Sequence, residues 1–170
     1  RMENKAQFGA KSTAEEVTAG IDLSGQTWLI TGCNSGLGYE TARVLALRGA
    51  RIIGLARTQE KAADALKALG IDGVPVACEL SDLGSVREAV QQIRELGPLD
   101  GIIANAGIMA LPKRQVAHGL ELQFLTNHVG HFILVTGLLD HLTEEARVVI
   151  LSSSAHTMAR QGIDLDDLAS

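Results

Sequence analysis

Five short apolar segments alternate with segments of helical periodicity, and this order constrains the fold more than any other feature of the sequence. The expected strands are Thr27–Thr31, Arg51–Ala56, Val74–Cys78, Asp100–Ala104 and Arg147–Leu151. Strands that are apolar on both faces are typical of a sheet covered by helices on each side, and strands joined by helices run parallel. The sequence therefore predicts an α/β fold, a Rossmann-type doubly wound parallel sheet with helices on both faces.

The chain is expected to form one main domain preceded by a short extension. Residues 1–22 are the extension, and Thr13-Ala-Glu-Glu16 has the spacing of a capping box, which predicts a short helix there. Residues 23–170 are expected to form the Rossmann domain. Within it, we expect a loop and one long helix with an apolar face between Pro112 and about Leu142.

Composition argues against several classes of partner. The net charge is −5 and the basic residues are scattered, so neither nucleic acid nor an anionic membrane surface is expected as a partner. No apolar run approaches the roughly 18 residues of a membrane span, and we expect a cytoplasmic protein. Cys33 and Cys78 lack a CxxC partner, and His128 and His131, although spaced to chelate zinc, have no acidic or cysteine neighbour. No metal site is predicted.

Three glycines, Gly32, Gly36 and Gly38, lie where the first expected strand gives way to the first helix. The N-terminus of a helix attracts anions, because its backbone N–H groups have no partners within the helix and its dipole is positive there. Glycine in such a turn allows tight bending, approach of the backbone to phosphate oxygens and close packing of helix on sheet. A strand-to-helix turn can contain glycine for geometry alone, but this placement favours binding of a dinucleotide.

Four motifs in order resemble those of the short-chain dehydrogenases/reductases. Thr31-Gly-Cys-Asn-Ser-Gly-Leu-Gly38 is similar to the TGxxxGxG signature and Asn105-Ala-Gly107 to the NAG motif. Asn127, in TNHVGHF, matches the active-site asparagine, and RVVILSSSAH resembles the strand that bears the catalytic serine. The resemblance extends from about Leu23 to His156 and is strongest to the subgroup of retinol dehydrogenases and WW-domain oxidoreductases.

The resemblance implies hydride transfer between a nicotinamide dinucleotide and a small alcohol or carbonyl substrate. It assigns cofactor binding to Gly32, Asn34, Ser35, Gly36, Leu37, Gly38, Arg57, Glu79, Leu80, Asn105, Ala106 and Gly107. Ala56 stands where an acidic residue would favour NAD, and the Arg57 guanidinium can pair with a 2′-phosphate. We therefore expect NADP(H) as the preferred cofactor, with NAD(H) possible. The alternative is that Arg57 only decorates a loop. Glu79 replaces the aspartate that the family carries on the adenine side.

The catalytic residues implied by the resemblance are Asn127 and Ser153, with Ser152 or Ser154 as alternatives one residue away. The serine cluster could instead serve turn formation, and Asn127 could bond only locally. The family's Tyr-x-x-x-Lys segment is expected after Ser153, whereas the only tyrosine, Tyr39, belongs to the first helix. We therefore expect the N-terminal part of a longer enzyme, inactive by itself.

The fifth expected strand would then be an exposed apolar edge, a type of edge that invites pairing with another chain. We expect the 170-residue chain to be marginally stable or to form a homo-oligomer. The alternative function is a non-catalytic dinucleotide-binding module or pseudoenzyme.

Overall fold

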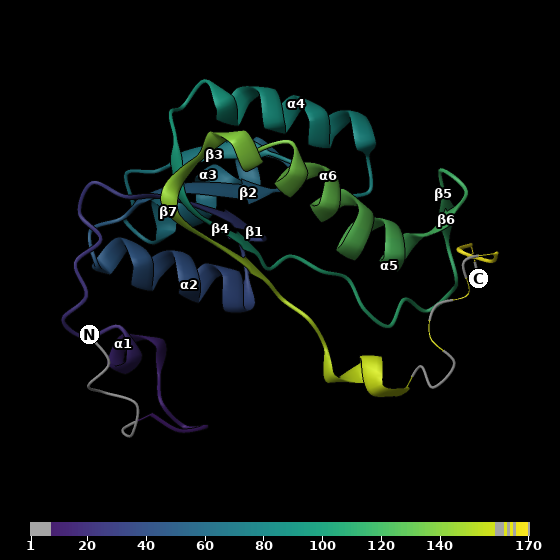
Figure 1. Ribbon diagram of the computed structural model, residues 1–170, viewed down its shortest axis with the longest axis horizontal. Coiled ribbons are helices and arrows are strands. Elements are labelled where there is room, and N and C mark those ends of the chain that lie inside the picture. Colours follow the sequence, from purple (N-terminus) through teal and green to yellow (C-terminus); the bar gives the residue numbers. More distant parts are fainter. Residues whose placement is uncertain (1–7, 159–161, 163, 165, 170) are drawn as a thin grey trace.

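The computed structural model describes residues 8–158, 162, 164 and 166–169, and a parallel sheet of five strands organises it (Figure 1). The strand order is β3-β2-β1-β4-β7. The strands are β1 Thr27–Thr31, β2 Arg51–Ala56, β3 Val74–Ala77, β4 Leu99–Ala104 and β7 Leu142–Ile150. The predicted Rossmann-type fold is confirmed.

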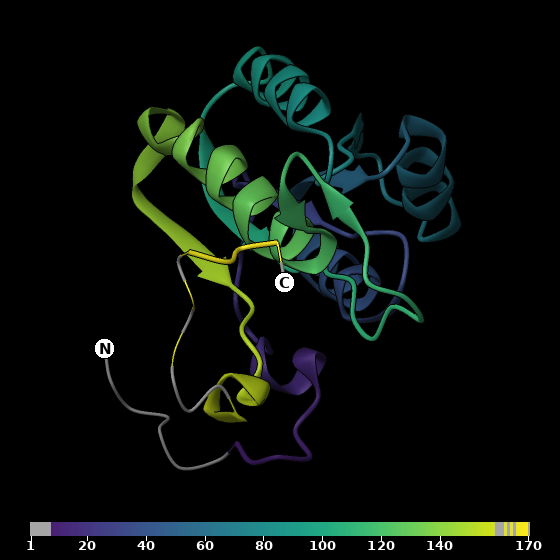
Figure 2. The same ribbon diagram turned by 90° about the vertical axis from the view of Figure 1, so that its right-hand side faces the viewer.

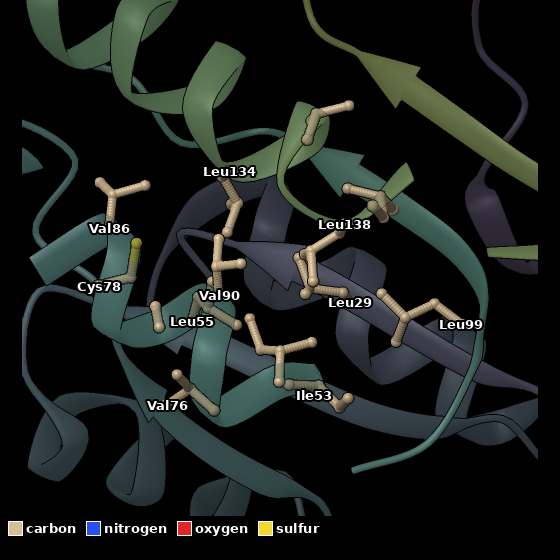
Figure 3. Packing of buried hydrophobic residues seen from close by; sticks show 14 of the residues in the cluster. Leu29, Ile53, Leu55, Val76, Cys78, Val86, Val90, Leu99, Leu134 and Leu138 are labelled. Carbon is tan, nitrogen blue, oxygen red and sulfur yellow. The ribbon is translucent and has the colours of Figure 1, made fainter. Parts of the chain in front are cut away.

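Helices cover both faces of the sheet, as Figure 1 shows. Residues on α2 Gly36–Leu47 and α3 Gln59–Ala68 pack with Ile30 and Ile52 on one face. On the other face, α4 Leu83–Arg94 and α6 His131–Thr136 cover a cluster that includes Leu29, Ile53, Val90 and Leu134 (Figure 3). Neighbouring residues of β1, Leu29 and Ile30, thus point to opposite faces, as the pleat of a strand requires. The sheet is apolar on both sides because both sides are buried.

Local signals set the boundaries of two of these helices. The Thr58 hydroxyl accepts a hydrogen bond from the Lys61 backbone N–H at the start of α3, and Gly70 follows that helix with a φ of +66°. At the start of α4, the Asp82 carboxylate accepts hydrogen bonds from two backbone N–H groups. Such caps satisfy donors that have no partner within the helix. The hydrogen bonds at Thr58 and Asp82 therefore stabilise the first turns of α3 and α4.

The helix expected before the last strand is present over residues 122–136, but a hairpin rather than a plain loop precedes it. A hairpin of β5 Val116–Ala117 and β6 Leu120–Glu121 comes first, turning at His118 and Gly119, which have φ of +53° and +77°. The helix then runs without a break through α5 Leu122–Phe124, the π-helical η1 Leu125–Gly130 and α6, and η2 Leu139–His141 comes after it. The backbone stays in the right-handed helical region at both junctions, Leu125 and His131, and the π-helical turn changes the direction in which side chains project.

The N-terminal extension contains the expected short helix, α1 Ala14–Val17, with both hydrogen bonds of the capping box at Thr13. Arg43 of α2 forms an ion pair with Glu15, and Arg48 Nε donates to Thr18 Oγ1 over 3.0 Å. These contacts fasten α1 to α2. The division into residues 1–22 and 23–170 remains a prediction.

Strand β7 forms the outer edge of the sheet beside β4, and its apolar side chains are partly exposed. Val149 is 45% exposed and Ile150 62%. Beyond β7 the chain leaves the sheet and forms η3 Ser154–Met158 (Figure 2). In the described part of the chain, no helix has the length and apolar character that crossing a membrane requires.

Candidate functional site

A cavity of about 490 Å³ opens at the carboxyl ends of β1, β2, β3 and β4. Its wall contains most of the predicted cofactor-binding residues: Gly32, Asn34, Ser35, Leu37, Arg57, Glu79, Leu80, Asn105, Ala106 and Gly107. The wall also contains residues that were not predicted from the sequence: Thr31, Leu55, Ala56, Lys61, Cys78, Ile108, Thr126 and Leu151. Residues separated by up to 120 positions therefore converge on one cavity.

The turn between β1 and α2 forms one side of the cavity and depends on glycine at two points. Gly32 has a φ of +70°, and a Cβ there would lie 3.1 Å from Ala106 Cα. A Cβ on Gly38 would lie 2.3 Å from the Gly32 carbonyl oxygen, closer than atoms can approach. Gly36 and Gly38 do not line the cavity; Gly38 lets α2 start directly against the turn. No side chain caps α2 at Ser35, so the positive end of this twelve-residue helix is left for a bound anion.

Thr31, the last residue of β1, fixes the turn that follows β4. Its hydroxyl oxygen accepts hydrogen bonds from the backbone N–H groups of Asn105 and Ala106, each over 2.9 Å. The Asn105 side-chain amide donates to the Thr31 carbonyl oxygen over 3.0 Å. These three bonds hold the Asn105-Ala-Gly107 turn against the glycine turn. Thr31 belongs to the glycine motif, which could have drawn attention to it.

Charged side chains stand where β2 and β3 end. Arg57 is 65% exposed, and its Nε lies 4.0 Å from Glu79 Oε2. The other carboxylate oxygen of Glu79 accepts hydrogen bonds from the backbone N–H and hydroxyl of Ser81. Lys61 adds a second cation to the wall from the first turn of α3. Its position three residues after Thr58 was a usable signal, because the first turn of the helix after β2 borders the same end of the sheet.

The two predicted catalytic residues are placed differently. Asn127, on η1, accepts a hydrogen bond from the Ile108 N–H and donates one to the Ile108 carbonyl, both over 2.8 Å. A Cβ on Gly107 would lie 3.4 Å from Asn127 Oδ1, so Asn127 adjoins the turn after β4. Ser153 is exposed beyond β7, and its hydroxyl oxygen accepts the Ala155 N–H. The structure brings Asn127 to the predicted cofactor residues but does not place Ser153 in the cavity wall.

Two buried cysteines lie at the site without being reactive. Burial raises the pKa of the Cys33 thiol to about 11. Burial, followed by the nearby Glu79 carboxylate, raises the pKa of Cys78 to about 12. Both are thiols rather than thiolates near neutral pH, and only a thiolate is a good nucleophile.

The two histidines considered as a zinc pair do different things. His131 is buried and hydrogen-bonds Thr31 and Asn127, whereas His128 is exposed and stacks on Phe124 with ring centroids 5.2 Å apart. Among the described residues, no three His, Cys, Asp or Glu side chains are grouped so that they could hold a metal ion.

Comparison with known proteins agrees with this geometry. The sequence model of the short chain dehydrogenase family matches residues 26–164. The chain belongs to the short-chain dehydrogenase family. The matched region contains the cavity wall and the whole parallel sheet, so the family predicted from the four motifs is confirmed.

Curated short-chain dehydrogenases resemble this chain along most of its length. The relative named short-chain dehydrogenase TIC 32 A, chloroplastic, from Brassica napus is 42% identical over 177 residues, covering 95% of this chain and 55% of the relative. The WW domain-containing oxidoreductase of Drosophila melanogaster is 36% identical, covering 94% of this chain and 41% of the relative. The chain thus spans about half the length of these relatives.

Solved structures of the family share the fold. An uncharacterized protein from Mycobacterium paratuberculosis superposes with a TM-score of 0.71 at 43% identity, covering 80% of this chain and 49% of that one. A short chain dehydrogenase from Burkholderia cenocepacia, crystallised with NADP, has a TM-score of 0.66 at 27% identity, covering 81% and 59%.

Proposed function

We propose that this chain is the dinucleotide-binding part of an oxidoreductase that transfers a hydride between NADP(H) and a small alcohol or carbonyl substrate. The observation that carries the proposal is the position of the cavity. It lies at the carboxyl ends of the strands, where the order β3-β2-β1-β4 reverses direction between β1 and β4. Ligands of open α/β sheets bind at such a switch point.

The residues present fit a dinucleotide in two respects. The turn from Gly32 to Gly38 would hold the pyrophosphate with main-chain N–H groups, because Gly32 and Gly38 leave no room for a Cβ and the turn meets an uncapped helix. The Asn105–Gly107 turn would contact the nicotinamide half, and Asn127 adjoins that turn. When bound, the nicotinamide ring supplies or accepts the hydride.

A preference for NADP(H) rests on the charges at the ends of β2 and β3. Arg57 and Lys61 both line the cavity, and Ala56 supplies no carboxylate that would repel a 2′-phosphate. Glu79 leaves NAD(H) possible, since its carboxylate lies 4.0 Å from the Arg57 guanidinium and competes for it. The NADP bound to the Burkholderia cenocepacia structure supports the same choice by analogy.

For catalysis, we assign Ser153 to hold the substrate oxygen and Asn127 to the active site. Leu151 lines the cavity and Ser153 follows it by two residues, so the assignment requires the exposed segment after β7 to bring the hydroxyl to the cavity. Asn127 would support the reacting end of the site through its paired hydrogen bonds to Ile108.

A titration of the protein, at the full length its gene encodes, with NADPH and with NADH tests the proposal. We expect tighter binding of NADPH, and we expect Arg57→Asp to weaken NADPH binding at least tenfold while leaving NADH binding unchanged or improved. Arg87→Asp is the control, because it changes the charge equally on α4, where Arg87 bonds to the Leu83 carbonyl of its own helix. Failure to bind either dinucleotide at millimolar concentration would refute the function. An unchanged preference in Arg57→Asp would remove the argument for NADP(H).

A non-catalytic dinucleotide-binding module is the second candidate, and the position of Ser153 outside the cavity wall favours it. Tyr39 is the only tyrosine of these 170 residues, and it lies on α2. Arg43, four residues later, is engaged by Glu15 and Glu40 rather than free to assist it. Binding of NADPH by the full-length protein without its oxidation by any member of a panel of aldehydes and ketones would support the module. Turnover with any of them would exclude it.

A further inference from the structure

His131 is a buried histidine whose two ring nitrogens both have partners. The side chain is 4% exposed, on the first turn of α6. Its Nε2 lies 2.8 Å from the Thr31 hydroxyl oxygen, and its Nδ1 lies 3.0 Å from the Asn127 carbonyl oxygen. It therefore connects the end of β1 with the predicted active-site asparagine.

The partners of Thr31 determine the tautomer of His131. The Thr31 hydroxyl oxygen already accepts the N–H groups of Asn105 and Ala106. A hydroxyl has two lone pairs and one proton, so the remaining interaction must be donation of that proton. The proton goes to His131 Nε2, which is therefore unprotonated, and Nδ1–H donates to the Asn127 carbonyl. The imidazole is neutral and carries its proton on Nδ1.

These hydrogen bonds close a ring around the inner wall of the site. Thr31 bonds His131, His131 bonds the Asn127 carbonyl, and the Asn127 carboxamide bonds both backbone groups of Ile108. The chain then returns from Ile108 to Ala106, whose N–H donates to Thr31. Asn127 lies within the π-helical segment η1, a local structure that often occurs at functional sites.

We infer that His131 is a positioning residue, which holds Asn127 and the turn after β4 at a fixed separation beneath the dinucleotide through its neutral, Nδ1-protonated ring. The inference rests on the proposed function for its ligand. The role needs both nitrogens of the imidazole, because Nε2 must accept a hydrogen bond from Thr31 while Nδ1–H donates one to the Asn127 carbonyl.

Protonation would break the ring of hydrogen bonds. An imidazolium presents N–H at both nitrogens, so Nε2–H would face the Thr31 O–H, whose lone pairs are occupied. Burial lowers the pKa of His131, the hydrogen bond to the Asn127 carbonyl raises it, and His128 on the preceding turn lowers it, with a net shift downward. The groups that hydrogen-bond the imidazole, the Thr31 hydroxyl and the Asn127 carbonyl, are uncharged.

The sign of the pH dependence follows from this lowered pKa. The contribution of the neutral imidazole to the free energy of unfolding is fully present above the ordinary histidine pKa of about 6.5 and is lost as pH falls from there through the lowered folded-state pKa. If His131 positions the site, dinucleotide affinity should fall at the lower end of this range, where His131 of the folded protein becomes protonated.

The experiment uses the full-length protein with ¹⁵N-labelled histidine. We expect the imidazole ¹⁵N shifts of His131 to show the Nδ1–H tautomer at pH 7.5. His131→Leu, which removes both bonds, should weaken NADPH binding at least about fivefold, the effect of losing a single neutral hydrogen bond. His131→Gln, which keeps an acceptor for Thr31, should recover part of that loss and remove the acid step of the affinity profile. His128→Gln is the matched control and should keep both the affinity and the acid step.

An Nε2–H tautomer, or an acid step that survives in His131→Gln, would overturn the inference. If His131→Leu fails to fold, the wild-type tautomer and the His131→Gln profile still decide it. If the wild type binds no dinucleotide, the proposed function fails instead. The ring of hydrogen bonds is then tested separately, by the tautomer of His131 and by the loss of folding stability in acid.

Discussion

Replacing Thr31 by valine isolates what one hydroxyl group contributes to this site. Valine has nearly the same shape, so the packing of this residue, 1% exposed, should change little. The substitution removes the acceptor for the Asn105 and Ala106 N–H groups and the donor to His131 Nε2. Three polar groups lose a partner at once.

The size of the effect follows from counting those groups. A net hydrogen bond contributes about 1 kcal/mol, and a buried group left without a partner costs about 1–3 kcal/mol. Asn105 and Ala106 are only half-buried and can recover some hydration, which favours the lower value for their N–H groups. We therefore expect Thr31→Val to lower the free energy of unfolding by about 3 kcal/mol. Thr31→Ser keeps the hydroxyl and loses one methyl group, which costs about 1 kcal/mol.

Urea unfolding of the full-length protein, followed by circular dichroism, measures both variants. The valine variant should be about 2 kcal/mol less stable than the serine variant, the difference between the two costs above. Its affinity for NADPH should fall as well, since the turn after β4 is released, whereas the serine variant should bind nearly as the wild type does. A valine variant as stable as the serine variant would refute the reasoning, because packing rather than the hydroxyl would then account for Thr31.

Two further predictions concern the glycine turn and the edge of the sheet. Gly38→Ala should weaken NADPH binding at least tenfold by titration, because its Cβ would lie 2.3 Å from the Gly32 carbonyl oxygen; Gly84→Ala, whose Cβ would lie 3.2 Å from the nearest side-chain atom in the first turn of α4, should bind normally. In the 170-residue chain, Val149→Lys should reduce self-association in sedimentation, because an edge lysine opposes strand pairing, and Ile21→Lys, outside the sheet at similar exposure, should not. Equal self-association of these two lysine variants would argue against pairing through β7.

The strands were predictable because their signals are local. β1 and β2 begin and end at the residues predicted, since each is an apolar run bounded by glycine or polar residues. β7 was predicted to begin at Arg147 but begins at Leu142. The polar stretch between these residues pairs irregularly with β4, with Thr143 donating to the Asp100 carboxylate. Backbone pairing at an exposed edge does not require apolar side chains, so the sequence pattern carried no sign of it.

In the candidate site, too, some residues were predictable from local sequence and others were not. Residues within a contiguous motif were found, because the turn itself dictates glycine or a small residue. Lys61 was missed, because its place in the wall depends on which helix terminus borders the ends of β2 and β3. The partnership of Thr31 and His131 joins residues 100 positions apart, and it exists because the sheet places β1 next to β4 while α6 packs over both.

This dependence on strand order explains why His131 looked like half of a zinc pair in the sequence. Spacing along a helix places His128 and His131 near each other, but it does not say which of them faces the sheet. Burial decides the matter: a neutral imidazole with a donor and an acceptor can satisfy Thr31 and Asn127 together, whereas an apolar residue would leave the Thr31 O–H without an acceptor and the Asn127 carbonyl without this donor. A polar residue in an apolar helix is thus explained by the polar groups of other elements that it must satisfy, and those groups become visible only when the fold is known.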